Sequence, residues 1–239
     1  MGPQTRSGAA GSMLLSVVVP TLDEEAAIAA ALAAARAELA TGDELIVADG
    51  GSTDRTVAIA RSCGALVVES VRGRGRQMNA GAAAAGGELL LFLHADTRLP
   101  AGWREGLESV LAAPEVCWGR FDIEFDQGGW LLQLIARLIS ARSRLFRSAT
   151  GDQAIFVRSA DFHAVGGYRH AHLFEDVDLA RTLRARGRMG IPPGRAVTSA
   201  RRWRNRGVWA TTLRMWTLKT LYLCGVPVER LERHYGEER

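Results

Sequence analysis

A short apolar run at residues 89–93 leads directly into His94, Ala95 and Asp96, and it constrains the fold more than any other segment of the chain. It is one of four short apolar runs that end at turn residues, as buried strands do. Alanine-rich stretches with helical spacing separate these runs. The runs span residues 14–19, 45–47, 66–68 and 89–93, and the helical stretches span residues 24–39, 54–63 and 77–85. Strands that alternate with crossover helices predict an α/β fold with a mostly parallel central sheet and helices on both faces.

Two of the predicted strands end near a carboxylate. The run at residues 45–47 leads to Asp49 and to a small-residue turn that contains Gly51, and the run at residues 89–93 leads to Asp96. The carboxyl ends of parallel strands open into one crevice, where α/β proteins bind ligands. We therefore expect both carboxylates to face a single cleft, with a nucleotide near one and a metal ion near the other.

The 239 residues are 47% apolar, which is enough to bury the core of one large domain. We expect a loose tail at residues 1–12, a catalytic domain at residues 13–205 and a C-terminal helical appendage at residues 206–239. Lysine and arginine outnumber aspartate and glutamate by 30 to 26. The arginines cluster in two loops, a pattern that suits phosphates or an anionic membrane and excludes nucleic acid as a partner. Three scattered cysteines without metal-ligand spacing favour a reducing cytoplasm.

The second half of the chain is expected to build the acceptor side of the site. Its pattern predicts four further helices and two extended segments. The helices span residues 101–111, 130–146, 176–186 and 208–223, and the extended segments span residues 116–125 and 153–157. Of these, the helix at residues 130–146, together with residues 151–153, is placed next to the acceptor by its order along the chain.

The last predicted helix, at residues 208–223, is apolar and aromatic but carries Arg214 and Lys219 near its middle. Each charge would cost roughly 2.5 to 3.5 kcal/mol at the centre of a bilayer, so the helix is not expected to span a membrane. Three arrangements stay open: packing on the domain, pairing with a second copy in a homodimer, or lying amphipathically on a membrane surface.

Two segments of the first half have both a structural and a functional interpretation. A predicted strand ends and a predicted helix begins around Pro20, Thr21, Leu22 and Glu24. Either the acidic residues of this segment cap the helix, or the backbone of the segment lines a base or ribose pocket. Capping alone does not require Asp49, two glycines and a second aspartate at one strand end. A carboxylate at Asp49 can accept the imide N–H of uracil. The chain has neither the G-x-G-x-x-G of a dinucleotide site nor a P-loop.

The segments that follow carry the candidate phosphate, metal and proton-transfer groups. Arg76 and Asn79 belong to an arginine-rich loop that opens a helix, which is either a pyrophosphate clamp or a solvated basic loop. Asp96 suits Mg²⁺ or Mn²⁺, which keep phosphate and water as further ligands, whereas His94 binds metal or ligand, or is a hydrogen-bonded strand-end residue. Glu175 and Asp176 either complement a helix N-terminus, or Asp176 is a general base whose pKa is raised by burial.

Taken in order, these motifs resemble the family 2 glycosyltransferases of GT-A fold over residues 14–203. The ordered set is Pro20-Thr-Leu-Asp-Glu24, Val47-Ala-Asp-Gly-Gly51, His94-Ala95-Asp96, Glu175-Asp176 and Ser199-Ala-Arg-Arg-Trp203. Two positions depart from the usual pattern: Asp23 stands where asparagine is common, and His94-Ala95-Asp96 stands where Asp-x-Asp is common. This variant resembles a compact bacterial subgroup associated with selenium, arsenosugar or carotenoid pathways.

The resemblance implies a UDP-sugar donor, a divalent Mn²⁺ or Mg²⁺ ion on Asp96, and Asp176 as the base of an inverting transfer. Uracil and ribose would lie near Asp49 and the segment after the first strand, and arginines would add positive charge to the diphosphate. The donor-side residues are Pro20, Thr21, Leu22, Glu24, Asp49, Gly51, Arg76, Asn79, His94, Ala95, Asp96, Arg201, Arg202 and Trp203.

The sequence therefore predicts a metal-dependent inverting glycosyltransferase that moves a hexose from a UDP-sugar to a small-molecule or lipid-like acceptor. We expect it in the cytoplasm, with peripheral contact at the membrane as one alternative. A nucleotidyltransferase would share the nucleotide and metal half but usually needs a glycine-rich, lysine-bearing loop near its first strand, which is absent here. A non-catalytic nucleotide-sugar or membrane-surface binding module is the remaining alternative.

Overall fold

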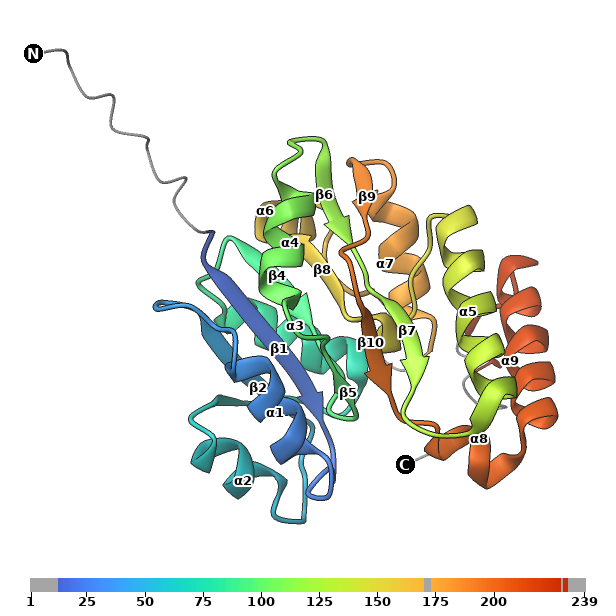
Figure 1. Ribbon diagram of the computed structural model, residues 1–239, viewed down its shortest axis with the longest axis horizontal. Helices are drawn as coiled ribbons and strands as arrows, with labels where there is room; N and C mark the ends of the chain where they lie inside the picture. The colour runs from blue at the N-terminus through green and yellow to red at the C-terminus, as the bar shows by residue number, and fades with distance from the viewer. Residues whose placement is uncertain (1–12, 170–172, 229, 232–239) are drawn as a thin grey trace, which may run out of the picture.

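The structure is a computed structural model that describes residues 13–169, 173–228 and 230–231. A central seven-stranded sheet has the strand order β3-β2-β1-β4-β8-β6-β9, and a smaller sheet has the order β5-β10-β7 (Figure 1). The strands are β1 (Leu15–Thr21), β2 (Glu44–Asp49), β3 (Leu66–Glu69), β4 (Leu89–Phe92), β5 (Thr97–Arg98), β6 (Val116–Gly119), β7 (Asp122–Phe125), β8 (Ile155–Arg158), β9 (Arg188–Gly190) and β10 (Arg195–Thr198). The helices are α1 (Ile28–Arg36), α2 (Thr56–Ser62), α3 (Arg74–Ala84), α4 (Trp103–Leu111), α5 (Gly129–Leu145), η1 (Gly151–Gln153), α6 (Ser159–Ala164), α7 (Glu175–Leu183), α8 (Arg201–Arg206) and α9 (Val208–Leu223).

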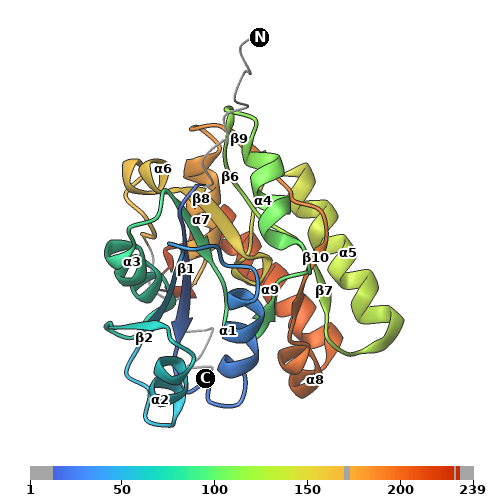
Figure 2. The same ribbon diagram turned by 60° about the vertical axis from the view of Figure 1, so that its left-hand side comes forward.

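Helices cover both faces of the central sheet, as the sequence predicts (Figure 2). Val17 and Val19 of β1 point to the face that α1, α2 and α4 cover. Val18, between them, points to the opposite face, where α3, α6 and α7 pack. Side chains alternate in this way because successive Cβ atoms of a strand point to opposite faces. The central strands β1 and β4 are therefore buried on both sides, whereas the edge strand β3 is partly exposed.

The four predicted parallel strands are confirmed, since β1 pairs in parallel with both β2 and β4, and β2 pairs in parallel with β3. In this register Thr21 lies beside Asp49 at the carboxyl ends of β1 and β2. Helix α1 begins at Ile28 instead of residue 24. The reason is that the amides of Glu24 and Glu25 donate to the Thr56 and Asp54 side chains, which ties this segment to the loop after β2.

The extended segment predicted at residues 116–125 is two strands in different sheets, β6 and β7. Between them, the Arg120 side chain is fully buried and donates to Asp122 and to the carbonyls of Phe121 and Ser140. These bonds give both terminal nitrogens of a buried guanidinium a partner at the point where the chain leaves one sheet for the other. Strand β8 runs antiparallel to both β4 and β6, so the central sheet is mostly but not wholly parallel.

Helix α9 has the bounds predicted from the sequence and lies beside α5 (Figures 1 and 2). Its Leu218 is buried with Leu173 and Phe174, and its Tyr222 ring stacks on Phe174 with the centroids 4.7 Å apart. One face of α9 therefore packs on the domain, which is the first of the three arrangements left open by the sequence. Within the described residues, none of the helices is long and apolar enough to cross a membrane.

Candidate active site

A pocket of about 2040 Å³ opens where the carboxyl ends of β1, β2 and β4 meet helices α5, α7 and α9. Its wall combines segments from both halves of the chain, which the sheet topology brings together. From the first half come Pro20, Leu22, Glu24, Gly51, Arg74, His94, Ala95 and Asp96, and from the second half come Arg142, Thr150, Asp152, Glu175, Asp176, Arg201, Trp203, Met215 and Lys219. Most of the predicted site residues therefore line one cavity.

Asp49 lies behind the pocket wall and organises it. Its side chain is 5% exposed, and one carboxylate oxygen accepts from the amides of Gly51 and Ser52 at 2.9 Å each. The other oxygen accepts from the Ser52 hydroxyl, and from the Thr21 hydroxyl at 3.3 Å. The carboxylate thus holds the turn whose Gly50 and Gly51 line the cavity. A contact between Asp49 and uracil stays a prediction, as does the role of the buried Thr21.

Gln77 is a structural residue of this region that sequence reasoning did not single out. Its amide group donates to the carbonyl of Thr21 at 2.6 Å and to the carbonyl of Ala48 at 3.0 Å. It therefore ties the ends of β1 and β2 to helix α3. A Cβ added to Gly50 would lie 3.0 Å from the Gln77 amide, so this turn needs a small residue. The sequence signal that could have identified Gln77 is its position as a polar residue in the first helical turn after a basic loop.

Of the three arginines at residues 72–76, Arg72 and Arg74 line the pocket and Arg76 does not. Helix α3 begins at Arg74, and residues two positions apart on a helix point in nearly opposite directions. Arg76 is exposed as a result. Asn79 also lies outside the pocket wall, because its amide exchanges two hydrogen bonds with the backbone of Tyr168. The basic segment thus contributes Arg72 and Arg74 to the cavity wall, whereas Arg76, the residue named as a donor contact, lies outside it.

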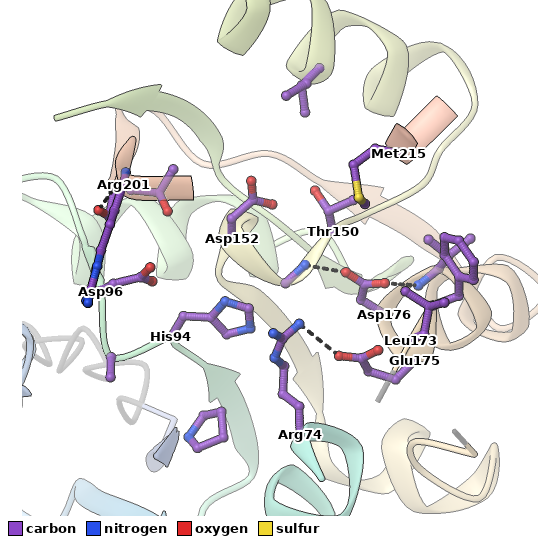
Figure 3. Close-up of a pocket in the computed structure, with 18 of the residues that line it drawn as sticks. Arg74, His94, Asp96, Thr150, Asp152, Leu173, Glu175, Asp176, Arg201 and Met215 are labelled. Carbon is purple, nitrogen blue, oxygen red and sulfur yellow. Dashed lines mark hydrogen bonds and ion pairs between the residues drawn. The ribbon is translucent and has the colours of Figure 1, made fainter. Parts of the chain in front are cut away.

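His94 and Asp96 leave the end of β4 and reach into the cavity (Figure 3). The Asp96 side chain is exposed, whereas His94 packs so tightly on Gly151 that an added Cβ there would lie 2.4 Å from the ring. No group of three or more His, Cys, Asp or Glu side chains in the described part of the chain could hold a metal ion. One accessible carboxylate nevertheless fits Mg²⁺ or Mn²⁺ when a diphosphate supplies further oxygens. Asp96 is the residue that would hold it.

Arg201 and Trp203 bring the C-terminal motif to the same cavity. Arg201 begins α8, and its side chain runs alongside Asp96 (Figure 3). Trp203 packs edge-on against Phe125 with the ring centroids 5.6 Å apart, which anchors α8 to β7. The side chain of Arg202, also predicted to face the donor, lies outside the described part of the structure. The pocket wall therefore includes Arg72, Arg74 and Arg201 among its cations.

Asp176 is a buried carboxylate at the start of α7, with 9% of its surface exposed. The amides of Gly151 and Val177 each donate to one of its oxygens (Figure 3). Burial, and next the charge of Glu175, raise the pKa of Asp176 to about 6, while Arg74 opposes the shift. Glu175 is 2% exposed and pairs with Arg74 at 3.1 Å. A carboxylate with this pKa is ionised at neutral pH and can accept a proton.

Two basic residues of the pocket wall were not predicted as site residues. Arg142 of α5 and Lys219 of α9 both line the cavity. The sequence offered a signal for Lys219 in the composition, because this residue is the only lysine of the chain. Asp152, on η1, lies between Asp96 and Asp176 in Figure 3. The pocket is consequently lined by carboxylates and cations along its whole length.

Comparison with solved structures identifies the architecture. S. aureus TarS (residues 1–349) superposes with a TM-score of 0.66 at 18% identity, over 79% of this chain and 61% of that one. Glucosyl-3-phosphoglycerate synthase from Mycobacterium tuberculosis, in complex with Mn²⁺, UDP and glucosyl-3-phosphoglycerate, gives 0.63 at 22%, over 90% and 81%. The mannosyltransferase PcManGT from Pyrobaculum calidifontis, with GDP-Man and Mn²⁺, gives 0.61 at 23%, over 80% and 57%. At such identities the likeness shows the fold, which is GT-A.

The sequence itself is the second line of comparison. Residues 16–165 match the family model described as Glycosyl transferase family 2, which is more than half of the chain. The match begins in β1 and ends after α6, so it includes the donor-side loops, Asp96 and η1. It stops before Asp176, whose place in the pocket comes from the structure. On the family match and the fold together, this chain belongs to the family 2 glycosyltransferases.

Proposed function

We propose that this protein transfers a sugar from a UDP-sugar to a hydroxyl group of its acceptor, with inversion at the anomeric carbon. The observation that carries the proposal is Asp176, a buried carboxylate with a raised pKa whose oxygens are oriented by two backbone amides at the wall of the pocket. A general base requires both this orientation and a pKa near the working pH. The segments proposed to bind the nucleotide, and Asp96, line the same cavity.

In the proposed reaction Asp176 accepts the proton of the acceptor hydroxyl as its oxygen attacks the anomeric carbon. The bond between that carbon and the β-phosphate oxygen breaks, and UDP leaves with the electron pair. Arg74 and Arg201 stabilise the negative charge that develops on the diphosphate. A divalent Mn²⁺ or Mg²⁺ ion held by Asp96 would supply further charge neutralisation. A single displacement requires no covalent sugar-enzyme intermediate.

The donor is proposed to lie with its base and ribose against Pro20, Leu22 and Glu24, next to the turn that Asp49 holds. UDP occupies this fold in the M. tuberculosis synthase, GDP-Man in PcManGT and UDP-GlcNAc in TarS. These neighbours support a nucleotide-sugar donor. Because their nucleotides and sugars differ, the base and the sugar of the donor are to be identified by experiment. A thermal-shift panel of UDP-glucose, UDP-galactose, UDP-N-acetylglucosamine and GDP-mannose, each with manganese, identifies the donor because a ligand of the native state raises the melting temperature.

Catalysis is tested by the release of UDP from the preferred donor in the presence of manganese. Wild-type protein is expected to release UDP slowly by hydrolysis, whereas Asp176→Asn loses the acceptor-dependent reaction. Asp161→Asn is the matched control, since Asp161 on α6 pairs with Arg186 and does not line the pocket. Donor binding without any release of UDP would favour a non-catalytic binding module. Release of pyrophosphate from a nucleoside triphosphate would favour a nucleotidyltransferase, although the only lysine lies far from β1 in sequence.

A lipid-like acceptor is supported by the apolar side of the pocket, where Ile139 of α5 and Met215 of α9 contribute to the wall. Trp130, Leu138 and Leu213 on the same two helices are 78%, 60% and 70% exposed. We propose that these side chains contact the membrane surface at the cytoplasmic face, or a second copy of the chain. Co-sedimentation with anionic vesicles distinguishes the two, because a homodimer instead shows a doubled mass in solution without vesicles.

A further inference from the structure

The single lysine of the protein stands in the pocket. Lys219 is the only lysine among the 30 lysine and arginine residues of the chain. It lies four residues after Met215, so both share one face of α9. Met215 points toward Thr150 and Asp176 (Figure 3), and Lys219 lines the same cavity. A lysine is thus present where α9 closes the acceptor side of the pocket.

A second cation approaches Lys219 from another helix. Burial, and next the charge of Arg142, lower the pKa of Lys219 to about 8, while Asp176 opposes the shift. Burial also lowers the pKa of Arg142, against the charges of Asp152 and Asp176. Two cations on α5 and α9 are therefore close enough to repel each other in a half-buried site. Such an arrangement is unfavourable unless an opposite charge balances it.

The protein supplies no direct counter-ion to this pair within the described residues. Neither the Arg142 nor the Lys219 side chain makes a hydrogen bond or an ion pair within 4.0 Å there, and the Arg142 Nε atom is buried without a hydrogen-bond partner. This contrasts with Arg74, whose guanidinium pairs with Glu175 at 3.1 Å in the same pocket. Buried polar groups are nearly always satisfied in native proteins, so an unsatisfied one calls for a ligand.

The position of the pair separates it from the donor diphosphate. Asp96 and Arg201 lie on one side of Asp152, and Met215, Thr150 and Asp176 lie on the other (Figure 3). Lys219 follows Met215 on α9, and the negative charge of Asp176 acts on both Arg142 and Lys219. The two cations are therefore close enough to the carboxylate that would receive the acceptor proton for its charge to act on both. Asp96, which would hold the metal, is not among the charges that act on them.

We propose that Arg142 and Lys219 form an anion-binding subsite that holds a phosphate or carboxylate group of the acceptor. This inference rests on the proposed function, and it names the class of acceptor: a hydroxylated phosphate ester or carboxylic acid. A guanidinium binds such oxygens bidentately, and an ammonium adds a point charge. The anion would fix the acceptor so that a hydroxyl a few bonds away reaches Asp176. Positioning of this kind by itself makes the hydroxyl more reactive.

The unique lysine allows a test that requires no transfer reaction. Acylation of the protein with an amine-specific reagent, followed by peptide mass spectrometry, reports the modification rate of Lys219 alone. Inorganic phosphate, sn-glycerol 3-phosphate and glycerate at millimolar concentration are expected to slow this rate several-fold, and glycerol to leave it unchanged. The ranking of the phosphate and carboxylate arms identifies the anion. Equal rates in all four solutions would overturn the subsite.

Matched arginine variants test the other half of the pair. Arg142→Gln is expected to weaken protection by the anions about tenfold, as the loss of one charge-assisted contact predicts. Arg137→Gln is the control, because Arg137 lies on the same helix, is exposed and does not line the pocket. Lys219→Arg keeps the charge and should retain anion binding in calorimetry, whereas Lys219→Gln should lose it. Equal anion affinity in Arg142→Gln and Arg137→Gln would also contradict the proposal.

The same samples separate this inference from the proposed function. UDP binding in calorimetry and UDP release by wild-type protein report the donor reaction without an acceptor. UDP release without anion protection of Lys219 would refute the subsite and leave the glycosyltransferase intact. Anion protection without UDP binding would refute the proposed donor, and with it the assignment of the anion to an acceptor.

Discussion

The backbone amide of Gly151 donates a hydrogen bond to the carboxylate of Asp176, which lies 25 residues further along the chain. The same glycine packs against the ring of His94 at the end of β4. One small residue therefore links the segment that carries the candidate base with the segment that carries the candidate metal ligand. Its lack of a side chain allows both contacts at once, which makes η1 the spacer between the two halves of the pocket.

Gly151→Ala is expected to destabilise the protein by about 1 to 3 kcal/mol, because its Cβ would lie 2.4 Å from His94. Catalytic turnover should fall as well, since the shifted backbone no longer orients Asp176. Urea denaturation and UDP release measure the two effects. The double variant with His94→Ala restores space and should recover part of the lost stability, whereas Gly86→Ala, which meets only a flexible Glu44 side chain at 3.3 Å, serves as the control. Strictly additive effects of the two pocket changes would contradict this packing.

Asp176→Asn should stabilise the protein more at pH 8 than at pH 4. The pKa of Asp176 is raised from 3.8 to about 6 in the folded state, chiefly by burial, so ionisation costs free energy only in the native protein. That cost is absent below pH 3.8 and complete above pH 6. The change in unfolding free energy on substitution should therefore rise by about 3 kcal/mol across this window. Comparing the two pH values cancels the constant effect of the altered hydrogen bonds.

The outcome is read from denaturation curves of wild type and Asp176→Asn at pH 4, 5, 6, 7 and 8. A difference between the two proteins that does not vary with pH would show that the carboxyl titrates normally. Asp161→Asn again serves as the control, because its exposed ion pair with Arg186 is expected to contribute less than 1 kcal/mol.

The rate of sugar transfer should rise with pH to a plateau, with the midpoint near pH 6, because only the ionised form of Asp176 accepts a proton. Glu175→Gln removes a negative charge that raises the pKa of Asp176, so the midpoint should move to lower pH. Arg74→Gln removes a positive charge that lowers it, so the midpoint should move to higher pH. The pH profile of kcat/KM measures both shifts, and a displacement of both variants in the same direction would exclude Asp176 as the titrating group.

Asp96→Asn should abolish the effect of manganese on UDP affinity. One protein carboxylate and the diphosphate oxygens are proposed to share the ion, so its loss leaves no charged ligand from the protein. Calorimetry of UDP binding with manganese, and again with a chelator, gives the metal-dependent increment in each protein. Wild type and Asp161→Asn should show the same increment and lose it with the chelator. An unchanged increment in Asp96→Asn would mean that another residue holds the metal.

The sequence by itself determined the parallel α/β half, the end of β4 at the His94 motif and the full extent of α9, because apolar periodicity and turn residues are local signals. Only the tertiary structure decided that Asp49 supports the pocket wall, that Arg76 lies outside the cavity that Arg72 and Arg74 line, and that β8 is antiparallel. It alone brought Arg142 of α5 and Lys219 of α9 into the same cavity. The reason is that helix phase, sheet order and burial depend on contacts between residues far apart in the chain, which no short window of sequence contains.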